Sequence, residues 1–266
     1  MAGYVLACFA AAVWLVPVAH AQVVKSFGFD EDGVLPSAQA DVEFFTTTGK
    51  PESSIFAVSG GMLRQTIPGT EGASTYSWPD VGQTQGTLDS SRAVWMETRM
   101  RLTSAMGIGA FVQVLDGARR YQIMFQAGSV VVLTAGGSSG FPIDTSQFRT
   151  YTIRSWGDSP VMWVYVDGEP RLSVTAPVTS LNGFAWGDGF FPMTNSGDAD
   201  WDWLEVGQDP ACRADCEDDG DLDIFDYLCF LNRFVDKDPY ADFEGDGDWD
   251  LFDYLAYQGE FADGCP

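Results

Sequence analysis

Apolar and charged residues alternate along residues 93–102 of this chain. One side of the extended segment would carry Val94, Met96, Thr98, Met100 and Leu102, and the other Trp95, Glu97, Arg99 and Arg101. A period of two places successive side chains on opposite faces of a β-strand. The pattern therefore predicts a strand with one buried face.

Short apolar runs continue along the chain with turn signals between them, at roughly the 8–12-residue spacing that is typical of all-β domains. Asp116-Gly117 and Asp167-Gly168 predict tight hairpin turns. The Gly/Ser-rich stretch 136–140 is predicted as a loop, and the strands are predicted at 111–115, 120–125, 130–134, 151–156, 161–166, 171–174, 184–186 and 200–206. Residues 22–207 are therefore expected to form an antiparallel β-sandwich of jelly-roll type.

The last part of the chain, residues 208–266, has a different pattern. A shift of 27 residues aligns residues 215–226 with 242–253, and the acidic ligand positions of the two segments coincide. A helix is predicted after each segment, at 227–234 and 254–261. In the first helix Tyr227, Phe230, Leu231 and Phe234 form one apolar stripe.

The two acidic segments have the spacing of a twelve-residue cation loop. Positions 1, 3, 5, 9 and 12 offer carboxylates, position 7 a backbone carbonyl, and Gly220 or Gly247 at position 6 allows a sharp turn. Like charges about 4 Å apart repel by roughly 1 to 4 kcal/mol, which a divalent ion converts into coordination. The predicted ligands are Asp215, Glu217, Asp219, Asp221, Asp223 and Asp226, then Asp242, Glu244, Asp246, Asp248, Asp250 and Asp253.

An all-oxygen ligand set of flexible geometry favours Ca²⁺ over Mg²⁺, zinc or copper. We therefore expect two calcium ions, one for each loop. The alternative is an acidic, solvated tail that binds no metal.

Charge limits the partners of the chain, because 38 acidic residues against 14 basic ones give a formal net charge of −24. Nucleic acid and anionic membrane surfaces would be repelled. The charge is uneven, since residues 208–266 hold 18 acidic and 3 basic residues. We place a domain boundary at 207–210.

Residues 1–21 contain no Asp, Glu, Lys or Arg and end in Ala19-His20-Ala21, which indicates a secretory signal peptide with its cleavage site. An uncleaved anchor is the alternative. Cleavage predicts a secreted, extracellular or cell-surface protein with no membrane segment. It also removes His20, the only histidine, and with it Ser-His-Asp catalysis and histidine-containing zinc sites.

Four cysteines remain after cleavage, Cys212, Cys216, Cys229 and Cys265, all near the carboxyl end. In an oxidising compartment they indicate up to two disulfides, for which three pairings exist. Four thiolates on zinc are the alternative, although no pair has the C-x2-C spacing.

Four segments of the sandwich region carry a diffuse family resemblance: 27–30, 60–64, 164–168 and 200–206. Together they resemble the concanavalin A-like lectin/glucanase superfamily, which implies a sandwich that binds or cleaves polysaccharide. The paired-carboxylate strings E-x-D-x-E and E-x-D-x-x-E of family 16 glucanases do not occur. The sequence leaves three roles open for Asp198, Asp200 and Asp202: a solvated edge, a cluster of calcium ligands or a catalytic pair.

Tryptophan rings can stack on the faces of sugars, and seven of the nine tryptophans lie in residues 78–203. Most are expected in the core, including Trp163 in its apolar strand. Trp78 and Trp186 stand beside loop signals, so these two are the predicted substrate-binding residues.

The duplicated loops, each with Asp at position 12 and a helix after it, are similar to the dockerin type I family. That resemblance implies attachment to a cohesin-like scaffold protein of polysaccharide-degrading assemblies. Ile224-Phe225 and Leu251-Phe252 occupy the positions that often carry a Ser-Thr pair. These apolar pairs leave it open whether a cohesin-like partner exists. Alternatively, the pairs are buried between the two repeats.

These patterns predict a secreted calcium-binding protein with a carbohydrate-binding sandwich, and no catalytic residue is assigned. The alternatives are a glycoside hydrolase with carboxylates from separate strands and a cell-surface protein that binds another protein. In the small C-terminal module we predict that Cys212 pairs with Cys265 and Cys216 with Cys229.

Overall fold

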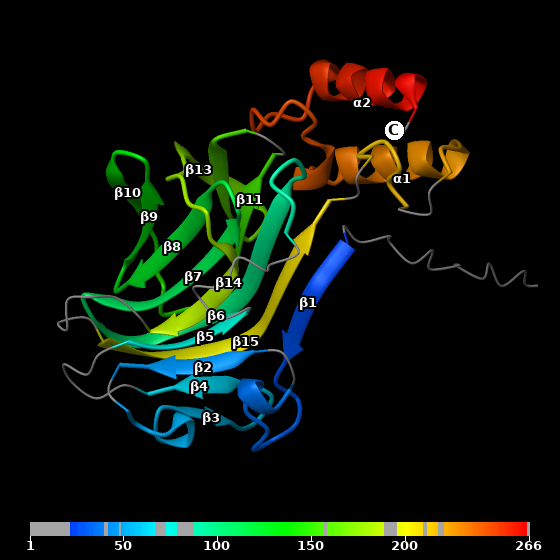
Figure 1. The fold of residues 1–266 in the computed structure, drawn as a ribbon. Coiled ribbons are helices and arrows are strands. Elements are labelled where there is room, and N and C mark those ends of the chain that lie inside the picture. Colours follow the sequence, from blue (N-terminus) through cyan, green and yellow to red (C-terminus); the bar gives the residue numbers. More distant parts are fainter. Residues whose placement is uncertain are drawn as a thin grey trace, which may run out of the picture.

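The computed structural model describes residues 22–39, 42–47, 49–66, 73–78, 88–156, 159–188, 196–209, 212–217 and 221–264. Two antiparallel sheets pack face to face, and a pair of helices lies at one end of them (Figure 1). The predicted signal segment, residues 1–21, lies outside the described residues. None of the helices in the described ranges has the length and apolar character that a membrane crossing needs.

The first sheet has eight strands within the described chain, and its order is β13-β12-β11-β6-β15-β4-β3, with β1 also paired to β15. Its strands are β1 (Gln22–Gly28), β3 (Phe56–Val58), β4 (Leu63–Gln65), β6 (Val94–Met106), β11 (Arg149–Ser155), β12 (Val161–Val166), β13 (Glu169–Thr175) and β15 (Ser196–Gln208).

The second sheet has seven described strands in the order β10-β9-β8-β7-β14-β5-β2. They are β2 (Glu43–Thr46), β5 (Ser74–Trp78), β7 (Ile108–Asp116), β8 (Arg120–Gln126), β9 (Ser129–Thr134), β10 (Gly137–Pro142) and β14 (Asn182–Asp188). Three short 3-10 helices, η1 (Pro36–Ala38), η2 (Glu52–Ser54) and η3 (Pro239–Ala241), complete the connections. The predicted antiparallel sandwich is therefore confirmed.

The alternating pattern of β6 places its two faces as expected. Met96 and Met100 have no exposed surface and pack between the sheets, whereas Glu97 and Arg99 are partly exposed on the outer face. Large aromatic side chains, among them Phe125, Tyr151 and Trp201, fill the space between the sheets. Their burial is the main source of stability for this part of the chain.

One prediction for the sandwich is wrong, because the Gly/Ser-rich stretch 136–140 is not a loop. It belongs to the exposed edge strand β10, which pairs with β9 from Gly137 opposite Thr134 to Pro142 opposite Ser129. A Cβ on Gly140 would lie 2.4 Å from the carbonyl oxygen of Val130. Glycine is required there by this close approach of the two backbones.

The C-terminal helices are α1 (Ile224–Val235) and α2 (Leu251–Asp263). Each begins three residues earlier than predicted, because Asp223 and Asp250 cap the first turn with their side chains. A separate small core lies around them, in which the rings of Phe230 and Tyr257 stack at 3.9 Å.

The C-terminal unit contacts the outer face of the eight-stranded sheet. Arg154 of β11 forms a buried ion pair with Asp209, and Arg213 lies 3.7 Å from the same carboxylate. The indoles of Trp156 and Trp163 donate hydrogen bonds to backbone carbonyls of the second acidic loop. The two parts of the molecule are therefore packed together.

Candidate functional site

The two acidic loops have the same local structure at their carboxyl ends. Asp223 and Asp226 form a capping box at the start of α1, and Asp250 and Asp253 form another at the start of α2. In such a box each side chain accepts a hydrogen bond from the backbone of the other residue. The 27-residue sequence repeat is thus also a repeat of structure.

The carboxylate at position 12 fixes two backbone positions of its own loop. Asp226 accepts hydrogen bonds from the N–H groups of Glu217 (3.1 Å) and Asp223 (2.8 Å). In the second loop Asp253 accepts them from Glu244 (3.1 Å) and Asp250 (2.9 Å). Positions 3, 9 and 12 therefore stand in matching geometry in the two loops.

Asp242, at position 1 of the second loop, is fully buried and directs its carboxylate into the loop. It accepts hydrogen bonds from the N–H groups of Asp246 (3.1 Å) and Gly247 (3.0 Å). Gly247 has φ +87°, a conformation that favours glycine. Burial raises the pKa of Asp242 to about 6, opposed by the hydrogen bond from Gly247 and assisted by the charge of Asp253.

The predicted ligands divide into a buried and an outer group. Asp215, Asp226, Asp242 and Asp253, at positions 1 and 12, are buried. Glu217 is half-buried, Asp219 lies outside the described residues, and Asp221, Asp223, Glu244, Asp246, Asp248 and Asp250 are exposed. Over the described ranges, no three carboxylates or thiols already converge into a metal-binding group.

The chemistry of the second loop nevertheless fits a hard cation. Asp242 and Asp253 are 0% and 1% exposed, and within the described chain neither forms an ion pair with lysine or arginine. A buried carboxylate without a cationic partner is costly. The donors around the pair are carboxylate and carbonyl oxygens, the ligands that Ca²⁺ takes.

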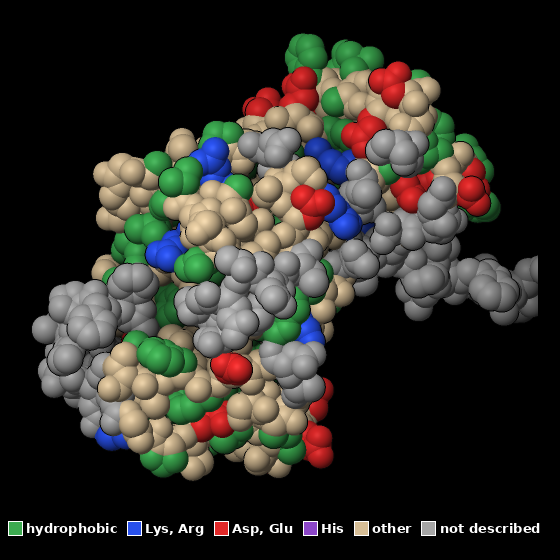
Figure 2. Space-filling view, in the orientation of Figure 1, with side chains coloured by type: hydrophobic (Ala, Val, Ile, Leu, Met, Phe, Trp, Pro, Cys, Tyr) green, Lys and Arg blue, Asp and Glu red, His purple; other side chains and the backbone are tan. Residues whose placement is uncertain are grey.

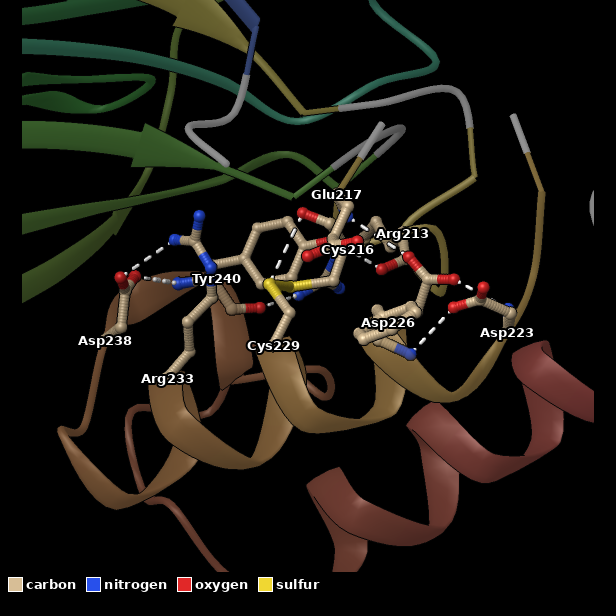
Figure 3. Close-up of a disulfide and its surroundings, with 10 residues drawn as sticks. Arg213, Cys216, Glu217, Asp223, Asp226, Cys229, Arg233, Asp238 and Tyr240 are labelled. Carbon is tan, nitrogen blue, oxygen red and sulfur yellow. Dashed lines mark hydrogen bonds and ion pairs between the residues drawn. A yellow bond between two sulfur atoms is a disulfide. The ribbon is translucent and has the colours of Figure 1, made fainter. Parts of the chain in front are cut away.

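One of the predicted disulfides is present. Cys216 and Cys229 are bonded and join the first loop to α1 (Figure 3), which confirms that pair and is incompatible with four thiolates on zinc. Cys212 is also disulfide-bonded. Cys265 lies outside the described residues, so the pairing of Cys212 with Cys265 stays a prediction.

The residues after position 9 form an exposed apolar surface on both helices. The alternative that the apolar pairs are buried between the repeats is wrong. All four residues, Ile224, Phe225, Leu251 and Phe252, are more than half exposed. Acidic and apolar side chains lie next to one another over the C-terminal helices (Figure 2). We call the set the repeated apolar surface: Ile224, Phe225, Leu228, Leu251, Phe252 and Leu255.

The tryptophans of the sandwich are placed differently from the predictions. Trp186 points into the core, has no exposed surface, and packs 4.9 Å from the ring of Phe27, so no face of it is open to a sugar. Trp78 is half-buried against Phe184 with Lys25 over its ring. Trp163, expected in the core, instead lies on the outer face and contacts the second loop.

Two of the three aspartates in the acidic run of β15, Asp200 and Asp202, pair with arginines of β6. Asp200 is 6% exposed and bonds to Arg101 at 2.7 Å, and Asp202 bonds to Arg99. A strand irregularity at Trp201 separates the two pairs. These carboxylates therefore serve as cross-strand ion-pair partners.

The outer face of the seven-stranded sheet carries a polar row that sequence patterns did not single out. Strand pairing sets Glu43 opposite Ser77, and Gln113 opposite Gln122, with Ala185 between these two pairs. Gln122 is fully buried, and its amide has no hydrogen-bond partner within the described structure. A buried amide without a partner is costly. Because Gln122 has no exposed surface, a polar ligand could reach its amide only after the side chain is uncovered.

A second carboxylate pair comes together on the outer face of the other sheet. Glu97 of β6 stands directly opposite Glu205 of β15, and it accepts a hydrogen bond from Thr152. Burial raises the pKa of Glu97, and the charges of Glu205 and Asp238 act in the same direction. Neither residue lies in a recognisable sequence string, so only strand pairing reveals them.

Glu97 also lines a groove of about 820 Å³ between the sandwich and the C-terminal unit. Asp167 and Glu169 contribute from the sandwich, and Asp238 and Asp248 from the C-terminal unit. A smaller hollow of about 200 Å³ beside it is lined by Trp95, Glu97 and Glu205. The carboxylate pair is thus next to space that a ligand can enter.

No protein-family model and no curated protein matches this chain. Among solved structures it is similar to an alginate lyase A1-II', a member of polysaccharide lyase family 7, with 15% identity over 60% of this chain and 85% of that one (TM-score 0.44). A β-1,3-1,4-glucanase (lichenase) from a mouse hindgut metagenome has 16% identity over 68% and 98% (TM-score 0.43).

The catalytic domain of an endo-1,3-β-glucanase (laminarinase) from Thermotoga petrophila has 16% identity over 72% of this chain and 99% of that one, with a TM-score of 0.43. Likenesses this distant carry no conclusion about activity. The sandwich fold is established by the strand pairing of this chain alone.

Proposed function

We propose that this is a secreted calcium-binding protein of polysaccharide recognition, with one Ca²⁺ in each acidic loop. The observation that carries the calcium proposal is the buried pair Asp242 and Asp253, which is oriented by backbone N–H groups and has no cationic partner among the described residues. The matching bonds of Asp226 extend the proposal to the first loop.

The predicted residues at positions 1, 3, 5, 9 and 12 would hold each ion, together with the carbonyl of Asp221 or Asp248. A bound Ca²⁺ supplies positive charge to buried carboxylates and draws the exposed ones inward. It would therefore act as a structural ion for a unit of small core.

Titration calorimetry of the full chain tests this proposal. We expect two calcium ions to bind and Asp253→Ala to remove one of them, whereas Asp263→Asn, an exposed carboxylate at the end of α2, leaves both. Absence of binding heat, together with a circular dichroism spectrum that chelator does not change, would overturn it.

The repeated apolar surface supports a protein partner, and because of the dockerin-like pattern the partner that we propose is a cohesin-like scaffold. Exposed apolar side chains that recur at the same positions of two repeats offer two equivalent binding faces. Phe225→Ala with Phe252→Ala should abolish capture by an immobilised cohesin domain. If the parent chain is not captured by any cohesin tested, the scaffold proposal fails while calcium binding stands.

For the sandwich, the leading proposal is glycan binding at the polar row that contains Gln113 and Gln122. Amide and hydroxyl groups match the hydroxyls of a polysaccharide, and the buried amide of Gln122 has unsatisfied donors and acceptors in the described structure. The proposal requires that a sugar chain uncover this amide when it binds. Affinity electrophoresis in polysaccharide gels should show retardation that Gln122→Ala reduces and Gln147→Ala, an exposed amide elsewhere, does not. Retardation that both variants retain would exclude this face.

A second candidate is a glycoside hydrolase, which the facing carboxylates Glu97 and Glu205 favour. Glycoside hydrolysis uses two carboxyl groups, one of which has a raised pKa and serves as the acid. If the pair is catalytic, Glu97→Gln should remove turnover on a polysaccharide panel while leaving calcium binding intact. Absence of turnover by the parent chain would leave the binding protein as the proposal.

A further inference from the structure

The second acidic loop is held by two tryptophans of the sandwich. Trp156, just after β11, donates its indole N–H to the carbonyl of Asp242, and Trp163 of β12 donates to the carbonyl of Gly245 at 2.8 Å. These carbonyls belong to positions 1 and 4 of the loop. The sandwich therefore fixes the backbone path along which the proposed ligands are arranged.

The same indoles leave no room for a side chain at two positions of the loop, Gly245 and Gly247. A Cβ on Gly245 would lie 2.8 Å from Cδ1 of Trp156, and one on Gly247 would lie 2.6 Å from Cη2 of Trp163. Real Cβ contacts are not that short, so either indole would have to move. Both glycines are required by contact with the sandwich.

A comparison of the two repeats supports this assignment of roles. Position 6 is glycine in both loops (Gly220 and Gly247), as the sharp turn of a cation loop requires. Position 4 is Asp218 in the first loop but Gly245 in the second. Glycine at position 4 of the second loop is favoured both by its backbone conformation, φ +69°, and by the close face of Trp156.

A further set of contacts fixes the start of the second loop. Arg213 donates to the carbonyls of Tyr240 (2.8 Å), Asp242 (3.2 Å) and Phe243 (3.1 Å), and its guanidinium lies 4.0 Å from the ring of Phe243. Asp209, which pairs with Arg154 of the sandwich, lies 3.7 Å from Arg213. The carbonyl of Asp242 is thus approached from both parts of the molecule.

We propose that Trp156 and Trp163 position the second loop for calcium, so that ion binding there and docking of the C-terminal unit on the sandwich strengthen each other. The inference rests on the proposed calcium binding. Such coupling is reciprocal: if docking tightens the site, the ion tightens docking by the same factor. It makes the two loops unequal, because the hydrogen bonds of these indoles go to the second loop in the part of the chain that the structure describes.

The test replaces both indoles conservatively in the full chain. Trp156→Phe with Trp163→Phe keeps aromatic packing and removes two hydrogen bonds of about 1 kcal/mol each. We expect one of the two calcium sites to weaken by roughly tenfold to thirtyfold, since 1.4 kcal/mol is a factor of ten. Trp203→Phe, on β15 of the same sheet and without a hydrogen bond to the loop in the described structure, is the matched control.

Gly245→Asp is a second and independent variant, because it gives the second loop the position 4 residue of the first. It leaves every proposed ligand in place and should weaken the same site, through contact with Trp156 and through backbone strain at φ +69°. Equal affinities in parent, Gly245→Asp and the double phenylalanine variant would overturn the coupling while leaving calcium binding established.

NMR provides a readout that does not depend on affinity. Calcium added to the parent chain should shift the indole N–H signals of Trp156 and Trp163 and slow their exchange with solvent, and it should leave Trp203 unchanged. Unmoved signals during a titration that binds two ions would refute the inference. If no calcium binds at all, the proposed function and this inference fall together, and the calorimetric titration identifies that case.

Discussion

The sandwich and the C-terminal unit are stabilised in different ways. Within the described residues, 33 buried residues form the main sandwich core, whereas 8 form the core of the C-terminal unit. Apolar burial grows faster than surface as a domain becomes larger, so the small unit gains less from it. Its cross-links, caps and proposed ions therefore carry a larger share of its stability.

The two regions also treat buried carboxylates differently. In the sandwich, Asp200 meets Arg101, and Arg154 of the sandwich also pairs with Asp209 at the start of the C-terminal unit. In the C-terminal unit, Asp242 and Asp253 meet backbone N–H groups, which orient the charge but do not neutralise it. The pair in the second loop is therefore the place that we propose for a cation. Asp188, a buried carboxylate of the sandwich, has neither a hydrogen-bond partner nor a second carboxylate beside it in the described structure.

The largest expected effect comes from removing calcium. An ion at a free concentration of 100 times its Kd stabilises its site by about 2.7 kcal/mol, and the two loops together by about twice that. Chelator should therefore reduce the helical circular dichroism of the C-terminal unit and lower its unfolding midpoint. The β signal of the sandwich should persist, and parallel loss of both signals would contradict the comparison.

Truncation of a core ring should affect the two regions unequally. Phe230→Ala and Phe125→Ala each remove a fully buried ring, at a cost of about 3–5 kcal/mol. In the C-terminal unit this cost should unfold α1 and α2, whereas in the sandwich it should only lower the denaturant midpoint. Urea titrations followed by far-UV and near-UV circular dichroism measure both outcomes. Equal responses would show that the small unit is not the weaker one.

Loss of the Cys216–Cys229 disulfide, which spans 13 residues, should cost about 3 kcal/mol in the chain-entropy description. Cys216→Ala with Cys229→Ala should lower the thermal midpoint of the C-terminal unit, and saturating calcium should recover part of the loss. The unfolding transition of the sandwich serves as the internal control. A shift in that transition would mean that the two parts unfold as one.

The last prediction depends on pH and concerns Asp188, at the end of β14 in the sandwich. It is 1% exposed and has no hydrogen-bond partner within the described structure, and burial raises its pKa to about 8. Between the ordinary value near 4 and about 8, the folded state holds a proton that the unfolded state has lost. Stability should therefore fall as the pH rises through this range, by at most about 1.4 kcal/mol for each pH unit.

Asp188→Asn should flatten this decline and raise stability at pH 7. Asp116→Asn is the matched control on the same sheet, because the Asp116 carboxylate accepts hydrogen bonds from Ala118, Arg119 and Tyr121 and should be destabilised by the change. Unfolding free energies at pH 5 and pH 8 decide the matter. An unchanged slope in Asp188→Asn would refute the assignment.

Sequence patterns predicted the local features well. Alternation located β6, and a short run between turn signals located β11. The Asp-Gly dipeptides located hairpin turns, and the 27-residue repeat located two matching loop–helix units. These features depend on neighbours along the chain. The helix starts were misplaced by three residues, although Asp at position 9 was a usable capping signal.

Features that depend on contacts between distant segments were missed or misplaced. Trp163 looked like a core residue because its strand is apolar on both sides, yet its outer face is covered by the second loop. Trp186 looked exposed beside a glycine, yet it packs in the core. A strand pattern gives the alternation of its faces but not what covers each of them.

The sequence by itself determined most of the elements, although not the edge strand β10, and the division into a β-rich part and an acidic repeated part. It also gave the Cys216–Cys229 bond as one of few possible pairings. Only the tertiary structure decided which carboxylates face one another and which tryptophans are buried. It also decided that the sandwich forms hydrogen bonds to the second acidic loop. The physical reason is range: propensity, capping and repeat spacing act over a few residues. Pairing of Glu97 with Glu205, or of Trp156 with Asp242, requires segments far apart in the chain to pack side by side.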